Sequence, residues 1–205
     1  MDSLQYTTRN ASRPARRAAS RHPALPHGRR SRGFTLIEAA ATLAILAVLA
    51  CGAAPSFHGL IERQRLAGLA AQLATDVQFA RSESILRNEA LRLSFYSEAW
   101  GSCYVVHSGA RNQCACTAGS SEATCIEDAT QIKTVSVPAS AGASVQANVS
   151  SILFDPLHGT STPTGTLRVR SPAVGSIHHV VNVLGRVRTC SPDGPAPAIP
   201  GYRVC

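Results

Sequence analysis

Two arginines near the end of the chain, Arg186 and Arg188, are separated by a single residue. In an extended strand alternate side chains lie on one face roughly 7 Å apart, so both cations would face outward and Val187 inward. Guanidinium groups bind phosphate oxygens bidentately, and such backbone contacts give sequence-independent, salt-sensitive affinity for nucleic acid. The alternative is a solvated strand edge, where arginine also blocks aggregation. The spacing is compatible with both.

The charge around this pair is positive, whereas most of the chain is nearly neutral. Residues 1–33 hold eight arginines against Asp2, so they carry +7 of the total +8. Residues 34–205 carry 12 − 11 = +1. The overall charge is therefore a poor guide to partners. Locally, residues 168–205 have five arginines against Asp193, a net charge of +4; the five are Arg168, Arg170, Arg186, Arg188 and Arg203.

The basic, proline-rich leader meets an apolar run at the junction Gly33-Phe34, and Glu38 is the one charged residue in that run. As an α-helix, residues 34–57 would span roughly 36 Å, which exceeds a hydrocarbon core of about 30 Å. A carboxylate near the start of a membrane helix costs up to about 3 kcal/mol unless a partner compensates it. We therefore expect a partner for Glu38. Alternatively, Glu38 lies among the headgroups and favours the helix N-terminus.

The same apolar run permits two other interpretations. A secretory signal could be cleaved near Gly52-Ala53-Ala54, although the run is long for a signal peptide. The sequence Val48-Leu49-Ala50-Cys51 resembles a lipobox in which Cys51 would be acylated, but Leu49 fits that motif poorly. We favour a membrane helix in which Cys51 is a small apolar residue.

The segment after the apolar run predicts a second, amphipathic half of the helix over residues 58–88. Apolar residues recur at three- and four-residue steps, which indicates one face packed on a core. The stripe comprises Leu66, Leu69, Ala70, Leu73, Val77 and Ala80, the opposite face carries Arg63, Arg65, Gln72, Gln78 and Ser82, and Asn88 is the expected stop. Core packing is the expected role of this half.

Beyond Asn88 the apolar period changes to two, which predicts an antiparallel β domain over residues 89–184. The predicted strands are 91–96, 102–107, 132–137, 143–149, 151–155, 166–170 and 177–184, with turns at 108–123, 138–142, 155–165 and 171–176. The expected fold class is α+β, a long N-terminal helix packed on an antiparallel sheet domain, followed by an arginine-containing tail at 185–205.

Seven cysteines bear on the compartment and on the tail. With Cys51 in the helix six remain, an even number that suits an oxidising compartment. The Pro/Gly-rich segment between Cys190 and Cys205 lacks the apolar content to fold alone, so we expect these two to pair. The other four could form two bridges of undetermined pairing; they are Cys103, Cys114, Cys116 and Cys125. A zinc site is the weaker alternative, since Cys-x-Cys without a second cluster is a poor zinc signal.

The sequence gives little support to an enzyme. His178 and His179 are adjacent on a predicted strand, so they point to opposite faces and do not easily share a ligand. No nucleophile elbow, zinc-protease motif or phosphate-binding glycine loop occurs. We expect no catalytic residue, cofactor or metal. Either histidine, if it faces outward near Arg170, could join an anion-binding patch at low pH, although packing is the expected role.

The junction resembles the N-terminus of type IV prepilins and pseudopilins. It has the Gly-Phe-Thr-Leu tetrad, Glu38, the apolar run, and Pro55 where these families carry a helix-kinking proline. The resemblance implies that a prepilin peptidase cuts between Gly33 and Phe34, that Phe34 is methylated, and that Glu38 pairs with the terminal amine of a neighbouring subunit. It also implies a single pass through the bacterial inner membrane, with the C-terminal domain in the periplasm before incorporation into a pilus or pseudopilus.

The order of leader, long helix, β domain and short tail is similar to the FimT/GspH group of minor pilins and pseudopilins. The strand and loop before the tail resemble those of this group at Phe154–Gly159, followed by a strand at Gly165–Leu167. The tail segment Gly185–Cys190 matches a Gly-Arg-x-Arg pattern whose arginines are implicated in DNA binding by FimT-type proteins during natural transformation. The resemblance implies DNA contacts by Arg186 and Arg188, with Arg168, Arg170 and Arg203 in support. A structural pseudopilin of type II secretion, or a pilus-priming subunit without DNA binding, is the alternative. The cysteine loop at 108–130 has no counterpart in this pattern.

Overall fold

The computed structural model describes residues 33–120, 122–194 and 197–205. The chain divides into two units, Met1–Ile45 and Leu46–Cys205, and the second contains the globular fold. Of the predicted leader only Gly33 lies within the described residues.

Helix α1, Leu36–Arg87, contributes the apolar stripe predicted from the sequence. Leu66, Ala70, Leu73, Val77 and Ala80 are all buried, while Leu69 is half-buried against the same core. The helix ends at Arg87, and the predicted stop, Asn88, follows it with a φ of 51°. Its N–H bonds to the carbonyl of Ile85, and the N–H of Glu89 bonds to that of Ser84. This αL ending satisfies carbonyls that the last turn would otherwise leave unpaired.

The N-terminal part of α1 was predicted to be a membrane span. Taken as one element, α1 does not meet the combined requirement of length and hydropathy for a membrane crossing, and no other single helix in the described residues meets it. Two consecutive stretches, Leu36–Gly52 and Phe57–Arg87, meet the length and composition requirements together. The span at residues 34–57 therefore stays a prediction.

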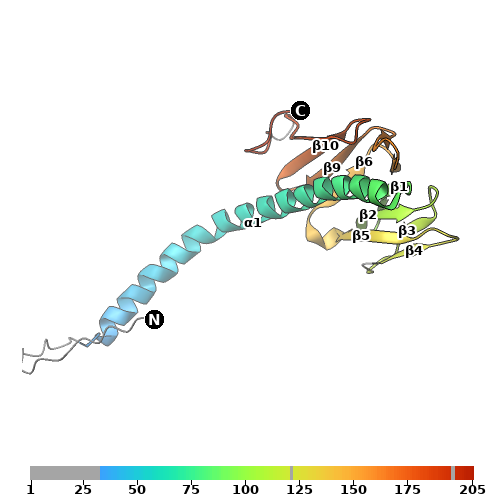
Figure 1. The fold of residues 1–205 in the computed structure, drawn as a ribbon. Coiled ribbons are helices and arrows are strands. Elements are labelled where there is room, and N and C mark those ends of the chain that lie inside the picture. Colours follow the sequence, from blue (N-terminus) through green and yellow to red (C-terminus); the bar gives the residue numbers. More distant parts are fainter. Residues whose placement is uncertain (1–32, 121, 195–196) are drawn as a thin grey trace, which may run out of the picture. The chain divides into compact units, whose positions relative to one another are not determined.

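The β domain consists of two antiparallel sheets and a separate hairpin (Figure 1). The five-stranded sheet has the order β5-β2-β1-β7-β8, with β1 Leu91–Glu98, β2 Gly101–Ser108, β5 Gln131–Pro138, β7 Ser151–Phe154 and β8 Ser161–Thr162. The four-stranded sheet has the order β11-β10-β9-β6, with β6 Ser144–Ala147, β9 Gly165–Ser171, β10 Gly175–Val181 and β11 Val187–Cys190. The hairpin joins β3, Cys114–Cys116, to β4, Ala123–Cys125, and η1 at Ala139–Ala141 follows β5.

All seven predicted strands exist, but the predicted turns and the tail contain further strands. The turn region 108–123 includes β3, the region 155–165 includes β8, and β4 and β11 were not predicted. The predicted strand 177–184 ends at Val181, because a turn at Asn182–Gly185 follows. The missed strands have two to four residues, too few for an alternating pattern to be detected.

The core of the second unit lies where α1 meets both sheets. Leu93, Tyr104 and Ile152 come from the five-stranded sheet, and Leu167, Val169 and Ile177 come from the four-stranded one. They share one buried cluster with the apolar stripe of α1. The helix therefore connects the sheet that carries the candidate arginines to the rest of the domain.

A charged residue inside the helix stripe was missed by sequence analysis. Asp76 is buried, accepts a hydrogen bond from the hydroxyl of Tyr104 at 2.8 Å, and pairs with Lys133 Nζ at 2.6 Å. Burial, the adjacent Asp76 carboxylate and this hydrogen bond raise the pKa of Tyr104. A buried carboxylate is tolerated when it is paired in this way. The cluster ties α1 to β2 and β5.

Candidate nucleic-acid interface

The turn between β10 and β11 places the arginine pair. The side chain of Asn182 accepts hydrogen bonds from the N–H groups of Leu184 and Arg186, and its carbonyl accepts one from Gly185. Gly185 has a φ of 68°, a region that favours glycine. A Cβ at this position would also lie 2.6 Å from Cδ of Arg81. The motif therefore needs this glycine for its backbone angle, and a larger residue would also displace the Arg81 side chain.

Two polar side chains of α1 hold this turn and the neighbouring loop. Gln78 Nε2 donates to the carbonyl of Gly185 at 2.9 Å, and Arg81 Nε donates to that of Gly159 at 2.7 Å. Gln78 was predicted on the outward face of the helix and is indeed exposed, yet it makes a specific contact. The hairpin formed by β10 and β11, called the arginine hairpin below because it carries Arg186 and Arg188, is thus held in position by α1 as well as by strand pairing.

Arg186 and Arg188 are both exposed, whereas Val187 is half-buried against the core. This agrees with the predicted alternation. The two arginines line a hollow of about 610 Å³ together with Gln78, Asn182 and Val187. A surface recess bordered by two guanidinium groups can accept an anion of phosphate size.

Arg203 approaches the same region through the disulfide-linked tail. The predicted Cys190–Cys205 disulfide is present, with Cα atoms 4.9 Å apart. Ser191 extends this link, because its N–H bonds to the carbonyl of Arg203. A second hollow, of about 480 Å³, is lined by Val180, Arg188, Thr189, Cys190, Arg203, Val204 and Cys205. Arg188 therefore borders both hollows, one shared with Arg186 and the other with Arg203.

Arg168 and Arg170 lie on the same sheet face as Arg188. Directly paired residues of neighbouring antiparallel strands share a face. Arg188 pairs with Val180, and Arg168 pairs with His178. His178 and Val180 are two residues apart on β10, so they point to the same face, and the buried His179 between them points into the core. Their partners Arg168 and Arg188 therefore point away from the core, and so does Arg170, two residues further along β9. Arg168 and Arg170 are exposed.

The adjacent histidines lie on opposite faces, as predicted. His179 is buried on the inner face, and its Nδ1 lies 2.9 Å from Thr189 Oγ1. His178 is half-buried on the outer face, with Nε2 3.3 Å from Ser176 Oγ. Burial lowers the pKa of His178, and Arg168 and Arg170 lower it further by charge repulsion. At neutral pH the free protein therefore carries an uncharged imidazole among these arginines.

Within residues 33–120, 122–194 and 197–205, no ion pair neutralises the candidate arginines of this surface. In the described part of the chain, the ion pairs are His58–Glu62, Arg87–Glu83, Lys133–Asp76 and His158–Asp155. None of them includes one of the five candidate arginines. Exposed guanidinium groups without an internal carboxylate are available to an external anion.

Comparison with protein families identifies the chain. Residues 69–185, more than half of its length, match the family described as type II transport protein GspH, and residues 28–54 match the prokaryotic N-terminal methylation motif. The chain belongs to the pilin-like GspH/FimT family. The GspH match includes Arg168 and Arg170 but ends at Gly185, immediately before Arg186.

Two solved structures are similar to this GspH-family protein. Both are crystal structures of the type IV minor pilin FimU from Pseudomonas aeruginosa strain PAO1. One has 17% sequence identity, covers 70% of this chain and 98% of FimU, and has a TM-score of 0.47. The other has 16% identity, coverages of 65% and 95%, and a TM-score of 0.43. No curated protein matches the chain.

The methylation motif of this GspH-family protein contains Gly33, Phe34 and Glu38. The Thr35 hydroxyl accepts a hydrogen bond from the Glu38 N–H at 3.3 Å, so Thr35 caps the start of α1. Glu38 is exposed in the first turn and belongs to no ion pair in the described residues. Membership of the family implies assembly with other pilin-like subunits, while the particular roles of these three residues stay predictions.

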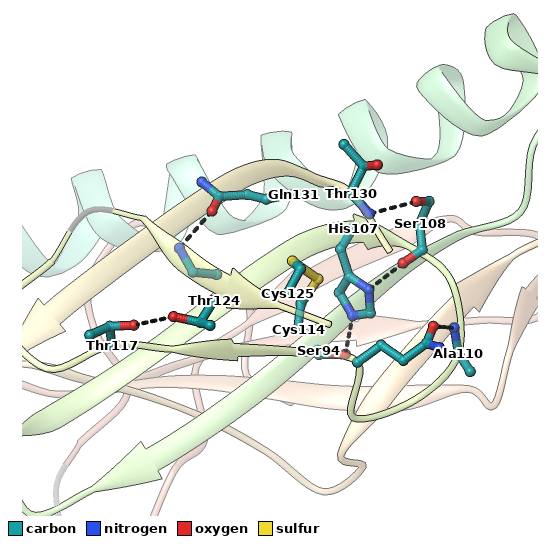
Figure 2. Close-up of a disulfide and its surroundings, with 12 residues drawn as sticks. Ser94, His107, Ser108, Ala110, Cys114, Thr117, Thr124, Cys125, Thr130 and Gln131 are labelled. Carbon is teal, nitrogen blue, oxygen red and sulfur yellow. Dashed lines mark hydrogen bonds between the residues drawn. A yellow bond between two sulfur atoms is a disulfide. The ribbon is translucent and has the colours of Figure 1, made fainter. Parts of the chain in front are cut away.

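The cysteine loop of the GspH-family protein carries the two bridges whose pairing the sequence left open. They are Cys103–Cys116 and Cys114–Cys125. The second joins paired positions of β3 and β4 (Figure 2). Because the first links this hairpin to β2, the hairpin covers a sheet face, and all of β2 beyond Gly101 is buried. No metal cluster of three or more ligands occurs in the described residues.

A serine–histidine pair next to this hairpin was not anticipated. Ser94 Oγ lies 2.8 Å from His107 Nε2, while His107 Nδ1 contacts the carbonyl of Ser108 (Figure 2). The exposed fractions are 2% for Ser94 and 0% for His107. Burial lowers the pKa of His107. Since neither group is accessible to a substrate, the pair satisfies buried polar atoms beneath the β3–β4 hairpin.

Proposed function

We propose that this GspH-family protein is a minor type IV pilin of the FimT type that binds DNA non-specifically during natural transformation. The observation that carries the proposal is the position of Arg188 between two hollows, one bordered by Arg186 and the other by Arg203. Arg168 and Arg170 extend the same positive face. Phosphate contacts of this kind accept any sequence, as DNA uptake requires.

The proposal includes how the protein reaches its site. A prepilin peptidase removes the leader between Gly33 and Phe34, and Phe34 is methylated. The N-terminal part of α1 anchors the subunit in the inner membrane with the β domain in the periplasm. Glu38 then pairs with the terminal amine of a neighbouring subunit during assembly. The three disulfides in the β domain are compatible with this oxidising compartment.

A second candidate function is a structural pseudopilin of a type II secretion system, or a priming subunit of a pilus, without DNA binding. The family description, type II transport protein, favours it. So does the end of the family match at Gly185, because the tail with Arg186 and Arg188 lies outside the matched segment. The two functions differ in whether the tail arginines contact DNA.

The deciding experiment compares DNA affinity between variants of the full-length chain in a non-ionic detergent. Arg186→Gln/Arg188→Gln should weaken binding similarly for unrelated duplex sequences. It should also make the slope of log affinity against log salt shallower by about 2. Arg63→Gln/Arg65→Gln is the matched control, since these exposed arginines have the same spacing on α1. The leader arginines contribute equally to all variants, so differences between variants remain interpretable.

In cells, natural transformation should fall with the Arg186→Gln/Arg188→Gln double variant at unchanged protein abundance. Unchanged affinity, salt slope and transformation in a folded double variant would favour the structural pseudopilin. An equal loss in the Arg63→Gln/Arg65→Gln control would show that general charge, and not the hairpin, determines binding.

A further inference from the structure

We propose that His178 is a proton-linked phosphate contact, so that DNA binding to the outer face of the β11-β10-β9-β6 sheet takes up a proton and strengthens as the pH falls. The proposal rests on the DNA-binding function above. It adds a sixth contact residue and a dependence on pH that the five arginines cannot provide, because guanidinium groups stay charged.

Strand register puts His178 in the middle of the candidate surface. On one side it pairs with Cys190 of β11 and on the other with Arg168 of β9. Neighbouring strands are about 4.8 Å apart, so the imidazole lies between the arginine of β9 and the tail arginines next to β11. A DNA backbone that contacts Arg188 and Arg168 together must pass over His178.

On the four strands of the sheet, the charged groups around His178 are all cationic: Arg168 and Arg170 on β9 and Arg188 on β11. The tail that packs on β10 contributes Asp193 as well as Arg203, which lies next to Arg188. The neighbours of Asp193, Pro192 and Gly194, line a hollow with Arg170 and Ser176. On β10 itself, Ser176 and Val180 are the outward neighbours of His178, and His179 faces inward. β6 contributes Gln146, which pairs with Arg168. None of these four strands contains an Asp or a Glu.

A bound phosphate reverses this environment. In the free protein, burial and the two β9 arginines hold the pKa of His178 below its ordinary value of 6.5. A phosphate on the neighbouring arginines adds negative charge, which stabilises the imidazolium and raises the pKa of His178 in the complex. Because the pKa of His178 is higher in the complex than in the free protein, the affinity for DNA increases as the pH falls through the pKa that His178 has in the complex. The increase in affinity levels off once the pH is below the pKa of His178 in the free protein.

The linkage predicts a change in the number of phosphate contacts as well as in affinity. Each protonated contact releases about 0.9 counterion, so the salt slope should be steeper by about 0.9 at pH 5.5 than at pH 7.5. The affinity at fixed salt should rise by no more than about tenfold per pH unit, since one proton is involved. These two readouts separate a direct contact from a general loss of fold.

The experiment measures affinity for a random-sequence duplex across salt concentrations at pH 5.5 and 7.5, using the full-length chain in a non-ionic detergent. The wild-type slope should steepen at pH 5.5, His178→Gln should show one slope at both pH values, and His178→Arg should show the steep slope at both. His58→Gln is the matched control, because His58 is exposed on α1 and pairs with Glu62. Calorimetry in two buffers of different ionisation enthalpy should detect proton uptake by the wild type and none by His178→Gln.

The outcomes separate this inference from the function on which it rests. Salt-sensitive DNA binding with a pH-independent wild-type slope overturns the role of His178 and leaves the DNA-binding function intact. A pH-dependent slope that persists in folded His178→Gln also overturns it. No DNA binding by the wild type at either pH refutes the proposed function and this inference together. The assignment to His178 comes from the difference in proton uptake between the wild type and folded His178→Gln. If His178→Gln does not fold, His178→Arg gives the same comparison, because a permanent charge at this position should remove the proton uptake.

Discussion

Gln78 of α1 donates a hydrogen bond to the carbonyl oxygen of Gly185 at 2.9 Å, although the two residues are 107 positions apart in the sequence. The bond joins the helix that a pilin-like subunit uses for assembly to the turn that precedes Arg186 and Arg188. It is direct, side chain to backbone, and needs no intermediate residue. The orientation of the arginine hairpin therefore depends on a residue that carries no charge itself.

Gln78→Ala should lower DNA affinity without changing the salt slope. The substitution leaves every arginine in place, so the number of phosphate contacts is preserved while the hairpin is held less firmly. The expected loss is roughly twofold to tenfold, corresponding to a hydrogen bond of about 0.5–1.5 kcal/mol. Gln72→Ala, an exposed residue of the same helix, is the control. A shallower salt slope in Gln78→Ala would contradict a purely positioning role.

The processing site gives a prediction that is independent of DNA. Protein recovered from membranes should begin at a methylated Phe34, and Gly33→Ala should retain the leader. N-terminal mass spectrometry checks both. An acylated Cys51, or a start near Ala54, would contradict the assigned cleavage.

Glu38 should matter after cleavage and not before it. Glu38→Ala should still lose the leader, because the cleaved bond precedes this residue, but it should be incorporated poorly into the pilus or pseudopilus. Immunoblots of sheared surface fractions measure incorporation against total protein. Normal incorporation of Glu38→Ala would contradict an assembly role for this carboxylate. Its remaining role would be to favour the N-terminus of α1, where it lies in the first turn.

Opening the tail disulfide should cost both stability and affinity. Cys190 and Cys205 enclose a sequence separation of 15, for which the chain-entropy model gives roughly 3 kcal/mol. Cys190→Ser/Cys205→Ser should lower the midpoint of thermal unfolding and weaken DNA binding, since Arg203 loses its fixed place beside Arg188. Cys51→Ser is the control, because Cys51 is a free cysteine on α1. Non-reducing peptide maps showing free thiols at 190 and 205 in periplasmic protein would refute the bridge.

The buried Tyr104 predicts a stability limit at alkaline pH. Its pKa is raised above the ordinary value of 10.0, so the unfolded chain loses this proton at a lower pH than the native protein. The stabilising contribution is complete below pH 10 and decreases above it, by about 1.4 kcal/mol per pH unit. Urea unfolding between pH 8 and 11.5 measures the slope. Tyr104→Phe should reduce the slope by about 1.4 kcal/mol per pH unit, and the part due to Tyr96, whose pKa burial also raises, should remain.

The features that sequence patterns predicted correctly are those that depend on residues close together in the chain. The stripe from Leu66 to Ala80 identified the buried face of α1, and Asn88 identified its end, because both depend on residues within a turn or two. The alternation of Arg186, Val187 and Arg188 also held, since a strand orients its own side chains.

Contacts between distant segments were not predictable in this way. Asp76 interrupts an apolar stripe and would normally be placed outward, but Tyr104 and Lys133 come from strands whose pairing the sequence does not reveal. Gln78 looked like a solvated polar residue for the same reason. The pairing of Cys103 with Cys116 and of Cys114 with Cys125 depends on the position of the β3–β4 hairpin against β2, which no local pattern in the sequence reveals.

The crossing disulfides of the β3–β4 hairpin also determine what proteolysis does to this subunit. Cys103 and Cys116 both precede the tip of the hairpin, whereas Cys114 and Cys125 lie on either side of it. A protease that cuts the tip once, after Cys116 and before Cys125, produces two polypeptides still joined through Cys114–Cys125. The cut subunit would migrate as one species until a reductant is added, so cleavage at this tip need not release a fragment.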